Sequence, residues 1–399
     1  MAREMKRKNL ENIDIVIKRS KDVLHCNVEW LLNSGINIKN GGDKGALYGW
    51  KYLNPPSYPF VYSEITGYAI SCFLWIHSHF GRSDALNAAK VAAEWITKNM
   101  NSEFLLVAGY RKQKNFVEKG DLSSQIYLFD NAMIFAGLLN LYKINREKSL
   151  LRLACKMADS LINYFFNGSL ISLALVDKLY RPRESAEKKW SASPGPYLSK
   201  LSIAFLELYK ETNDVRYAKI SNSVCDLSIS LQRPDGRFET TPHSEITFLH
   251  PHLYACEGLI YSSIFQSEKR YLESGIKGIR WAAKQVNSKG GLPRDNSKGS
   301  VEQSDAMCQL LRLLILCQSD LLELLGESLF ESTIDLLHKR ILDFCIMSSD
   351  INRGGVRYQI GLESACSWCA MFCMQALELW QENTRGLLKR DARWIDFFV

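Results

Sequence analysis

The chain has 399 residues, of which 46% are hydrophobic and 23% charged, a composition typical of folded globular proteins. Its 50 basic and 43 acidic residues give a net charge of +7, without the basic, aromatic-interleaved face that nucleic-acid binding requires. The longest apolar run, "MCQLLRLLILC" at 307–317, is too short to span a membrane and contains Arg312. We therefore expect neither a nucleic-acid partner nor a membrane span.

Cysteine usage and the N-terminal sequence indicate the cellular compartment. The eleven cysteines are odd in number, and most lie in apolar helical stretches, where free thiols pack as small hydrophobic groups. The start, "MAREMKRKNLENIDIVIKR", is basic and lacks the apolar segment of a signal peptide. These features predict a cytoplasmic protein without a disulfide framework.

Apolar residues recur with helical spacing along nearly the whole chain, in about twelve segments. Amphipathic segments, expected at the periphery, alternate with more uniformly apolar ones, expected to be buried on several sides. The peripheral set is approximately 10–35, 84–100, 147–166, 215–232, 269–287 and 326–347. The buried set is approximately 64–80, 124–143, 195–211, 251–268, 302–319 and 363–380.

The buried segments recur every 50 to 70 residues, which is a helix, a turn, a helix and a loop. Six such units predict an all-α fold, an (α/α)6 toroid in which six inner helices are surrounded by six outer ones. An open helical solenoid or two bundles are the alternatives. We expect one domain over 1–399, with 381–399 as a docked C-terminal tail. The longer loops all precede inner helices, so the functional cleft is expected at the N-terminal ends of those helices.

Carboxylates, imidazoles and aromatic rings stand at these predicted helix entrances. Aromatic faces stack on sugar rings and carboxylates bind hydroxyl groups, so this composition suits a carbohydrate site. The residues are Glu64, Asp130, Trp190, Tyr197, His250, His252, Asp305, Glu363 and Trp368. Helix capping is the alternative explanation for the carboxylates, because they also lie where free N–H groups and the helix dipole favour them.

Three Gly-containing turns place an arginine on the same face, at Arg237, Arg294 and Arg357. Arginines near one mouth would suit a carboxylated or phosphorylated ligand, and exposed arginines without a role are the alternative. Pro251 is expected to break the helix between His250 and His252. The histidines and cysteines match no established zinc spacing, and dinucleotide and phosphate-loop motifs are absent, so we expect no metal and no cofactor.

Several segments, among them "YSEITGYAI", "LFDNAMIFAGLLNLY", "PGPYLSKLSIAFLELYKETND", "LQRPDGRFE" and "HPHLYACEGLIY", resemble the six-hairpin carbohydrate-active proteins, including a bacterial polysaccharide-associated branch. That superfamily includes unsaturated glucuronyl hydrolases, other glycosidases, polysaccharide lyases and sugar epimerases. The resemblance implies a glycan site at the inner-helix entrances, with Asp130 matching the carboxylate that opens an early inner helix.

The leading hypothesis is a glycoside hydrolase acting on an acidic oligosaccharide of bacterial surface or exopolysaccharide metabolism. Asp130 would be the general acid/base, Glu64 or Asp305 its partner, and His252 a sugar-binding or proton-transfer residue. The residues expected to bind substrate are His250, Trp190, Tyr197, Trp368, Glu363, Arg237, Arg294 and Arg357. The alternatives are a uronate lyase or sugar epimerase that uses His250 or His252, and a non-catalytic toroid that binds a glycan or partner proteins of polysaccharide biosynthesis.

Overall fold

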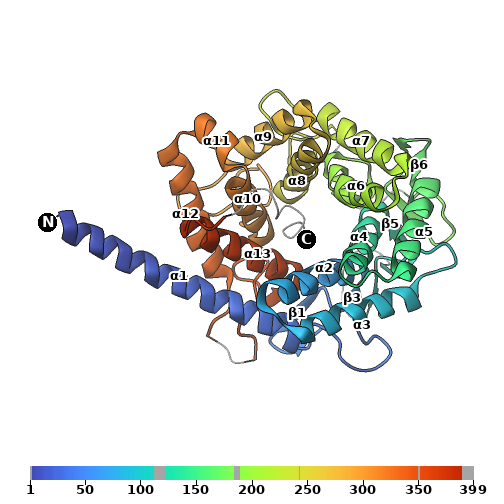
Figure 1. Cartoon of the computed structure of the whole chain (residues 1–399), viewed down its shortest axis with the longest axis horizontal. Coiled ribbons are helices and arrows are strands. Elements are labelled where there is room, and N and C mark those ends of the chain that lie inside the picture. The colour runs from blue at the N-terminus through green and yellow to red at the C-terminus, as the bar shows by residue number, and fades with distance from the viewer. Residues whose placement is uncertain (1, 112–121, 184–188, 242, 349–350, 389–399) are drawn as a thin grey trace.

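The computed structural model describes residues 2–111, 122–183, 189–241, 243–348 and 351–388, except the side chains of residues 2–13 and 111. In these ranges thirteen α-helices form a closed ring of two layers (Figure 1). The inner helices are α2 (Ser63–Phe80), α4 (Leu128–Asn145), α6 (Leu201–Thr212), α8 (Leu249–Gln266), α10 (Ser304–Leu316) and α13 (Ser367–Thr384). The outer helices are α1 (Ala2–Asn33), α3 (Ser83–Asn99), α5 (Lys148–Phe165), α7 (Val215–Ser230), α9 (Lys269–Ala283) and α12 (Glu327–Phe344).

The two layers follow from the distribution of apolar residues along each helix. The outer helix α5 buries Leu150, Ala154, Met157, Ala158 and Leu161, which share one face of the helix, and exposes its opposite face. Inner helices such as α8 are buried along almost their whole length, as uniformly apolar helices should be. The last inner helix, α13, packs against both α1 and α2, which closes the ring.

The first four inner helices, α2, α4, α6 and α8, each connect to the next outer helix by a short link. After α2 and α6 the chain turns through the left-handed conformation at Gly81 and Asn213, as glycine and asparagine readily do after a helix end. Between α10 and α12 this link is longer and contains a further helix, α11 (Gln318–Leu325).

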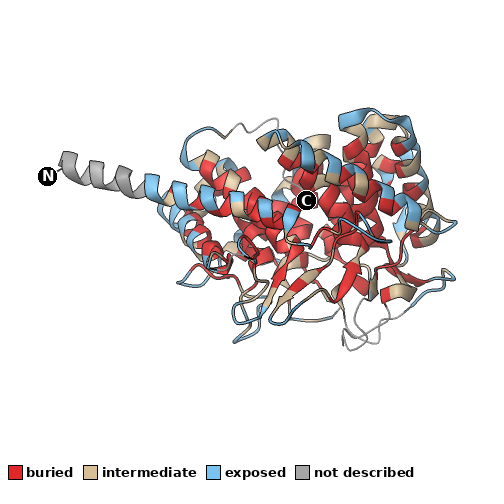
Figure 2. Cartoon of the chain, turned by 90° about the horizontal axis from the view of Figure 1, so that it is seen from below, coloured by how far each residue is buried: buried red, intermediate tan, exposed pale blue. Residues whose placement is uncertain are grey.

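Longer loops lead from outer to inner helices and carry short antiparallel strands. Figure 2 shows strands and long loops gathered along one edge of the ring. The strands are β1 (Trp50–Leu53), β2 (Pro56–Ser57), β3 (Phe60–Tyr62), β4 (Gly109–Arg111), β5 (Gln125–Tyr127), β6 (Phe166–Asn167), β7 (Leu170–Ile171), β8 (Leu175–Asp177) and β9 (Ser364–Cys366). They pair as β2–β1–β9, β3–β4, β5–β8 and β6–β7. Because β3, β5 and β9 run directly into α2, α4 and α13, these pairs fix where three inner helices begin. Three 3-10 helices, η1 (Leu122–Ser124), η2 (Trp190–Ala192) and η3 (Pro196–Lys200), complete the loops.

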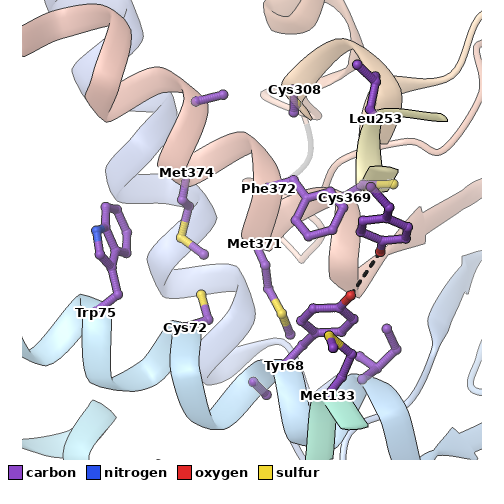
Figure 3. Close-up of a cluster of buried hydrophobic side chains, with 14 of the residues drawn as sticks. Tyr68, Cys72, Trp75, Met133, Leu253, Cys308, Cys369, Met371, Phe372 and Met374 are labelled. Atoms are coloured by element: carbon purple, nitrogen blue, oxygen red, sulfur yellow. Dashed lines mark hydrogen bonds between the residues drawn. The ribbon is translucent and has the colours of Figure 1, made fainter. Parts of the chain in front are cut away.

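The core lies between neighbouring inner helices and between the layers. Figure 3 shows Tyr68, Cys72 and Trp75 of α2 facing Met371 and Met374 of α13. These side chains are nearly inaccessible to solvent and belong to one continuous apolar cluster.

The predicted all-α fold is confirmed, and every predicted helix corresponds to one in the structure. The predicted break at Pro251 is wrong: α8 runs unbroken from Leu249, with Pro251 in its first turn. A proline is tolerated there because a first-turn N–H has no intrahelical partner. The expected docking of the C-terminal tail concerns mainly 389–399, outside the described residues. Among the described helices, none combines the length and the apolar character needed to cross a bilayer.

Candidate functional site

A cavity of about 320 Å³ opens among the N-terminal ends of the inner helices. Its lining comes from segments far apart in sequence, including the first turns of α2, α4, α8, α10 and α13. The lining residues are Trp50, Tyr62, Glu64, Ile65, Phe129, Asp130, Trp190, Ser191, Phe248, His250, Pro251, Tyr254, Arg294, Gln303, Asp305, Tyr358 and Trp368. Seven residues predicted from the sequence are therefore brought together: Glu64, Asp130, Trp190, His250, Arg294, Asp305 and Trp368.

Glu64 and Asp130 form a carboxyl pair in one wall of this cavity. Glu64 lies in the first turn of α2 and Asp130 in the first turn of α4, and the two side chains are in hydrogen-bonding contact. Both residues are buried, with exposed fractions of 8% and 4%. Two carboxylates that touch in a water-poor site cannot both be ionised without a large electrostatic cost, so such a pair retains a proton.

The environment of the pair favours that proton. Burial, followed by the nearby Glu64 charge, raises the pKa of Asp130 well above its usual range. Burial also raises the pKa of Glu64, while a hydrogen bond with Tyr62 and the positive charges of Lys189 and Lys200 oppose the increase. The surroundings of the pair therefore favour a protonated carboxyl group, the form that a general acid requires.

The close approach of α2 and α4 brings these carboxyl groups together. A Cβ atom on Gly137 of α4 would lie 2.5 Å from the main-chain oxygen of Gly67 in α2. A Cβ atom on Gly67 would lie 2.6 Å from the Cα of Ile134. Since real Cβ atoms do not approach other atoms so closely, both glycines are needed for the observed packing of the two helices.

His250, Asp305, Gln309 and Trp368 form a second polar group at the cavity. The His250 Nδ1 atom lies 2.7 Å from the Gln309 Oε1 atom and 3.6 Å from the Asp305 Oδ2 atom. Trp368 donates its indole N–H to Asp305 Oδ2 at 3.2 Å, and the Ala306 N–H donates to Asp305 Oδ1 at 2.8 Å. With two oxygen atoms facing Nδ1, the favoured neutral tautomer of His250 carries its proton there, which leaves Nε2 with the lone pair of a base.

Aromatic rings form much of the cavity wall. The ring of Trp368 lies 5.8 Å from Trp50, 6.4 Å from Tyr62 and 5.8 Å from Tyr358, measured between centroids. Trp190 packs against Phe129, at 6.3 Å, in another part of the wall. Such walls offer apolar ring faces beside polar groups, a composition that suits sugar rings.

Arg294 brings a cation to the cavity. Its side chain is about half exposed, and its Nε atom donates to the buried Asp295 carboxylate at 2.8 Å. Its guanidinium carbon lies 5.9 Å from the Phe248 ring centre. Held in this way, the guanidinium group could bind an anionic substituent on a ligand.

Two residues predicted to lie in the cleft are buried elsewhere in the fold. His252 is fully buried: its Nδ1 atom accepts a hydrogen bond from the Phe238 N–H, and its Nε2 atom lies 2.9 Å from the Gly278 oxygen. Burial lowers the pKa of His252 to about 4. Tyr197 is also buried and donates to main-chain oxygens of Ser191 and Ser193. Neither residue lines the cavity, because both are engaged in the packing around it.

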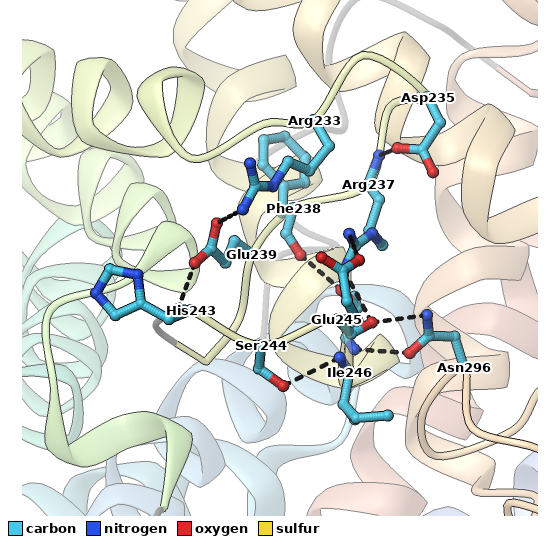
Figure 4. Close-up of polar contacts among 11 residues, drawn as sticks. Arg233, Asp235, Arg237, Phe238, Glu239, His243, Ser244, Glu245, Ile246 and Asn296 are labelled. Carbon is cyan, nitrogen blue, oxygen red and sulfur yellow. Dashed lines mark hydrogen bonds and ion pairs between the residues drawn. The ribbon is translucent and has the colours of Figure 1, made fainter.

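Three further predicted residues also lie outside the cavity lining: Arg237, Arg357 and Glu363. Arg237 turns toward Glu245, with a 2.6 Å ion pair and a 2.9 Å hydrogen bond to the Glu245 main-chain oxygen (Figure 4). The Arg357 main-chain oxygen accepts a hydrogen bond from the Ser304 hydroxyl. Glu363 is exposed, and its main-chain oxygen pairs with Leu53. The predicted grouping of three arginines at one mouth therefore reduces to Arg294.

A buried ionic network was not foreseen from the sequence. Lys200, at the end of η3, lies 2.6 Å from Glu257 of α8, and Arg312 of α10 lies 2.6 Å from the other Glu257 oxygen. These three side chains are 1–2% exposed. Burial lowers the pKa of Lys200 to about 8. The sequence did carry a signal for this network, because Glu257 and Arg312 are charged residues inside otherwise apolar helices and need buried partners.

The cavity also contains aromatic residues that the sequence reasoning did not select, among them Tyr62, Phe129, Tyr254 and Tyr358. Tyr254 lies one helical turn after His250 on α8, and that spacing could have identified it. The described residues contain no group of three or more histidines, cysteines, aspartates and glutamates arranged to hold a metal ion.

A wider groove of about 1030 Å³ lies on the outside of the ring, between α3 and α5. Its lining includes the long side chains of Lys90, Lys98, Arg152 and Lys156. We take the smaller cavity as the candidate functional site because, within the described part of the chain, buried carboxyl groups, a histidine and aromatic rings converge there.

No model of a known protein family matches the chain, and no curated protein matches it. Solved structures do. A sugar epimerase from a ruminal bacterium is 13% identical, with 92% of this chain and 100% of that one covered and a TM-score of 0.72. Cellobiose 2-epimerase from Bacillus thermoamylovorans B4167 is 13% identical, with 89% and 98% covered and a TM-score of 0.71.

The unsaturated glucuronyl hydrolase from Bacillus sp. GL1 is 14% identical, with 91% of this chain and 97% of that one covered and a TM-score of 0.63. At such identities the likeness concerns the fold, and a fold by itself does not determine the reaction. The chain thus has the (α/α)6-toroid fold that these carbohydrate-active enzymes share.

Proposed function

We propose that this chain is a carbohydrate-active enzyme and, more specifically, a glycoside hydrolase acting on an acidic oligosaccharide linked to bacterial surface or exopolysaccharide metabolism. The observation that carries the proposal is the buried Glu64–Asp130 pair in an aromatic-walled cavity. A carboxylic acid that stays protonated near neutral pH can protonate a glycosidic oxygen as the carbon–oxygen bond breaks.

The pair is better suited to act as one acid than as two separate catalytic groups. The carboxyl groups of a retaining glycosidase are about 5–5.5 Å apart, and those of an inverting one about 6.5–9.5 Å apart. Glu64 and Asp130 are in hydrogen-bonding contact and are closer than either spacing. We therefore assign the acid role to Asp130 and give Glu64 the role of holding its proton.

The second polar group supplies a proton acceptor. His250, with Nδ1 directed at Gln309 and Asp305, can use Nε2 to take a proton from a water molecule that adds to the anomeric carbon. The proton donated by the pair leaves with the released hydroxyl, so one water is consumed for each bond cleaved. Arg294 and the ring of Trp368 are proposed to bind an acidic sugar in the cavity.

A sugar epimerase or uronate lyase is the second candidate, favoured by the same His250 geometry. A neutral imidazole could remove the proton next to a sugar carbonyl or a uronic carboxylate, and an epimerase would return a proton to the opposite face. A toroid that only binds a glycan, or that contacts partner proteins of polysaccharide biosynthesis, is the non-catalytic alternative. The cytoplasmic location expected from the sequence stays a prediction.

The test is incubation of the purified protein with neutral and acidic oligosaccharides, followed by mass spectrometry. Wild type would be compared with Asp130→Asn and His250→Gln, and with Glu323→Gln as a control at an exposed site on α11. We expect fragments that together gain one water, formed by wild type and the control and lost in Asp130→Asn.

Other outcomes would redirect the assignment. Fragments without added water would indicate a lyase. Deuterium incorporated from heavy water without cleavage, lost in His250→Gln but retained in Asp130→Asn, would indicate an epimerase. Binding without any product would support the non-catalytic alternative.

A further inference from the structure

The buried ionic network of Lys200, Glu257 and Arg312 lies close to the carboxyl pair. Glu64 and Tyr68 are four residues apart and share one face of α2. Tyr68 donates a hydrogen bond to the Tyr254 hydroxyl at 3.0 Å, drawn as the dashed line in Figure 3, and Tyr254 itself lines the cavity. The Lys200 ammonium group lies 4.9 Å from the Tyr254 ring centre and 5.9 Å from that of Tyr68.

This geometry places the Lys200 charge behind the two tyrosines, on the protein side of the cavity wall. Lys200, Tyr68 and Tyr254 are all nearly inaccessible to solvent, so the attraction between Lys200 and Glu64 is screened much less than it would be at the surface. The attraction works in both directions: Lys200 opposes the rise in the pKa of Glu64, and Glu64 raises the pKa of Lys200 against the lowering effect of burial.

Glu257 holds Lys200 in place. One Glu257 oxygen binds Lys200 at 2.6 Å, and the other binds Arg312 at 2.6 Å. Close packing also fixes the segment that carries Lys200, because a Cβ atom on Gly258 would lie 2.1 Å from the Ser199 carbonyl. Holding a lysine in this way costs much of its side-chain freedom, and lysines are rarely buried unless they are paired. We therefore infer that the buried, paired position of Lys200 has a defined role.

We propose that Lys200 is a positioning residue for the acid pair: its charge, fixed by Glu257, stabilises ionised Glu64 and thereby keeps a single proton on the pair, available at Asp130. The assignment of that proton as the catalytic one rests on the proposed function. The electrostatic coupling itself does not, and it can be measured without any substrate.

The groups around the pair define what the test must separate. Around the pair, β3 contributes Tyr62, α2 contributes Tyr68, α8 contributes Tyr254 and Glu257, and α10 contributes Arg312. Lys189, in the segment before η2, also acts on both carboxyl groups. A test that changes Lys200 and Glu257 in turn distinguishes their charges from the fixed surroundings.

The experiment is infrared spectroscopy of the full chain from pH 5 to pH 8, below or near the pKa of Lys200. Protonated carboxyl groups have a carbonyl stretching band separate from that of carboxylates, and Asp130→Asn and Glu64→Gln would assign the contribution of the pair. Lys200→Met should move the loss of the first of the two protons upward by about one pH unit, a tenfold change in the ionisation constant. Glu257→Gln, which removes a negative charge, should move it downward.

Lys143→Met is the matched control. Lys143 also forms an ion pair, with the buried Glu207. It lies in the last turn of α4, about 20 Å along the helix from Asp130. We expect no shift in this variant. Equal spectra in wild type and Lys200→Met, or shifts of the same sign in Lys200→Met and Glu257→Gln, would overturn the proposal, because a purely structural effect has no reason to follow the sign of the charge.

The result is independent of the activity assay. If the infrared shifts occur and no substrate is cleaved, the coupling stands and the hydrolase assignment fails. If cleavage occurs and the infrared midpoint does not move, the hydrolase assignment stands and the role of Lys200 fails. Should Lys200→Met not fold, Glu257→Gln against Lys143→Met still decides, because a midpoint that is unchanged or moves upward contradicts the proposal.

Discussion

Trp368 donates its indole N–H to the Asp305 carboxyl group at 3.2 Å and so links the first turn of α13 to the first turn of α10 at the cavity. Asp305 is 1% exposed and also accepts a hydrogen bond from the Ala306 N–H. The same carboxyl oxygen lies 3.6 Å from His250 Nδ1. One indole therefore helps to hold the group that faces the histidine we propose as the base.

Replacing Trp368 by phenylalanine should separate the two roles of this side chain. The phenyl ring preserves an aromatic surface, but Asp305 loses a donor, and a buried polar group deprived of a partner costs about 1–3 kcal/mol. We expect the free energy of unfolding, measured with urea, to fall by that amount. A decrease below about 0.5 kcal/mol would mean that the indole N–H contributes little to the cavity wall.

Acidification should destabilise the protein through buried neutral histidines. Burial lowers the pKa of His338 to about 3 and that of His252 to about 4, from ordinary values near 6.5. Between these values the unfolded chain binds protons that the folded chain does not, so stability falls as the pH decreases from 6.5. Each histidine contributes a slope of roughly 1.4 kcal/mol per pH unit.

His338→Phe isolates one of these contributions, because His338 is stacked on Trp380 at 3.5 Å and an aromatic ring can replace it. Between pH 6.5 and pH 5, wild type should lose about 1.6 kcal/mol of unfolding free energy relative to the variant, because the unfolded histidine is already half protonated at pH 6.5. The exposed His25, replaced by glutamine, provides the control. Equal pH slopes in wild type and His338→Phe would refute the prediction.

A methyl group on Gly137 should disturb the carboxyl pair from a distance. Since the added Cβ would meet the Gly67 main-chain oxygen, α2 and α4 must move apart, at a cost of about 1–3 kcal/mol in the free energy of unfolding. The infrared band of the protonated pair should weaken as well. Gly42→Ala is the matched control, because nothing lies within 4 Å of its added Cβ. An unchanged band in a destabilised Gly137→Ala would show that the pair does not depend on this helix contact.

The helices could be predicted because their apolar spacing is a local property of the chain. The strands could not, since segments such as Pro56–Ser57 or Phe60–Tyr62 are too short to carry a periodic signal and depend on partners distant in sequence. The entrance carboxylates Glu64 and Asp130 were identified from position alone. Their contact could not be, because it depends on how closely two helices pack.

The histidines illustrate a different limit. Positions 250 and 252 are two residues apart in a continuous helix, so their side chains lie on nearly opposite faces. His250 reaches the cavity, whereas His252 is buried against Phe238 and Gly278. Recognising Pro251 as a first-turn proline would have separated them. The direction of Arg237 depends instead on Glu245, in the following loop, and no spacing rule indicates that pairing.

Two residues without side chains, Gly67 and Gly137, have a consequence for how such proteins can diverge. They set the gap between two carboxyl groups that neither glycine touches chemically. A related chain could keep the glutamate and the aspartate, yet lose their shared proton if bulkier residues stood at these two positions. In the mechanism we propose, the packing of α2 against α4 brings the two carboxyl groups together before any ligand binds. Small residues at the crossing of the two helices are therefore as informative about this chemistry as the carboxyl groups themselves.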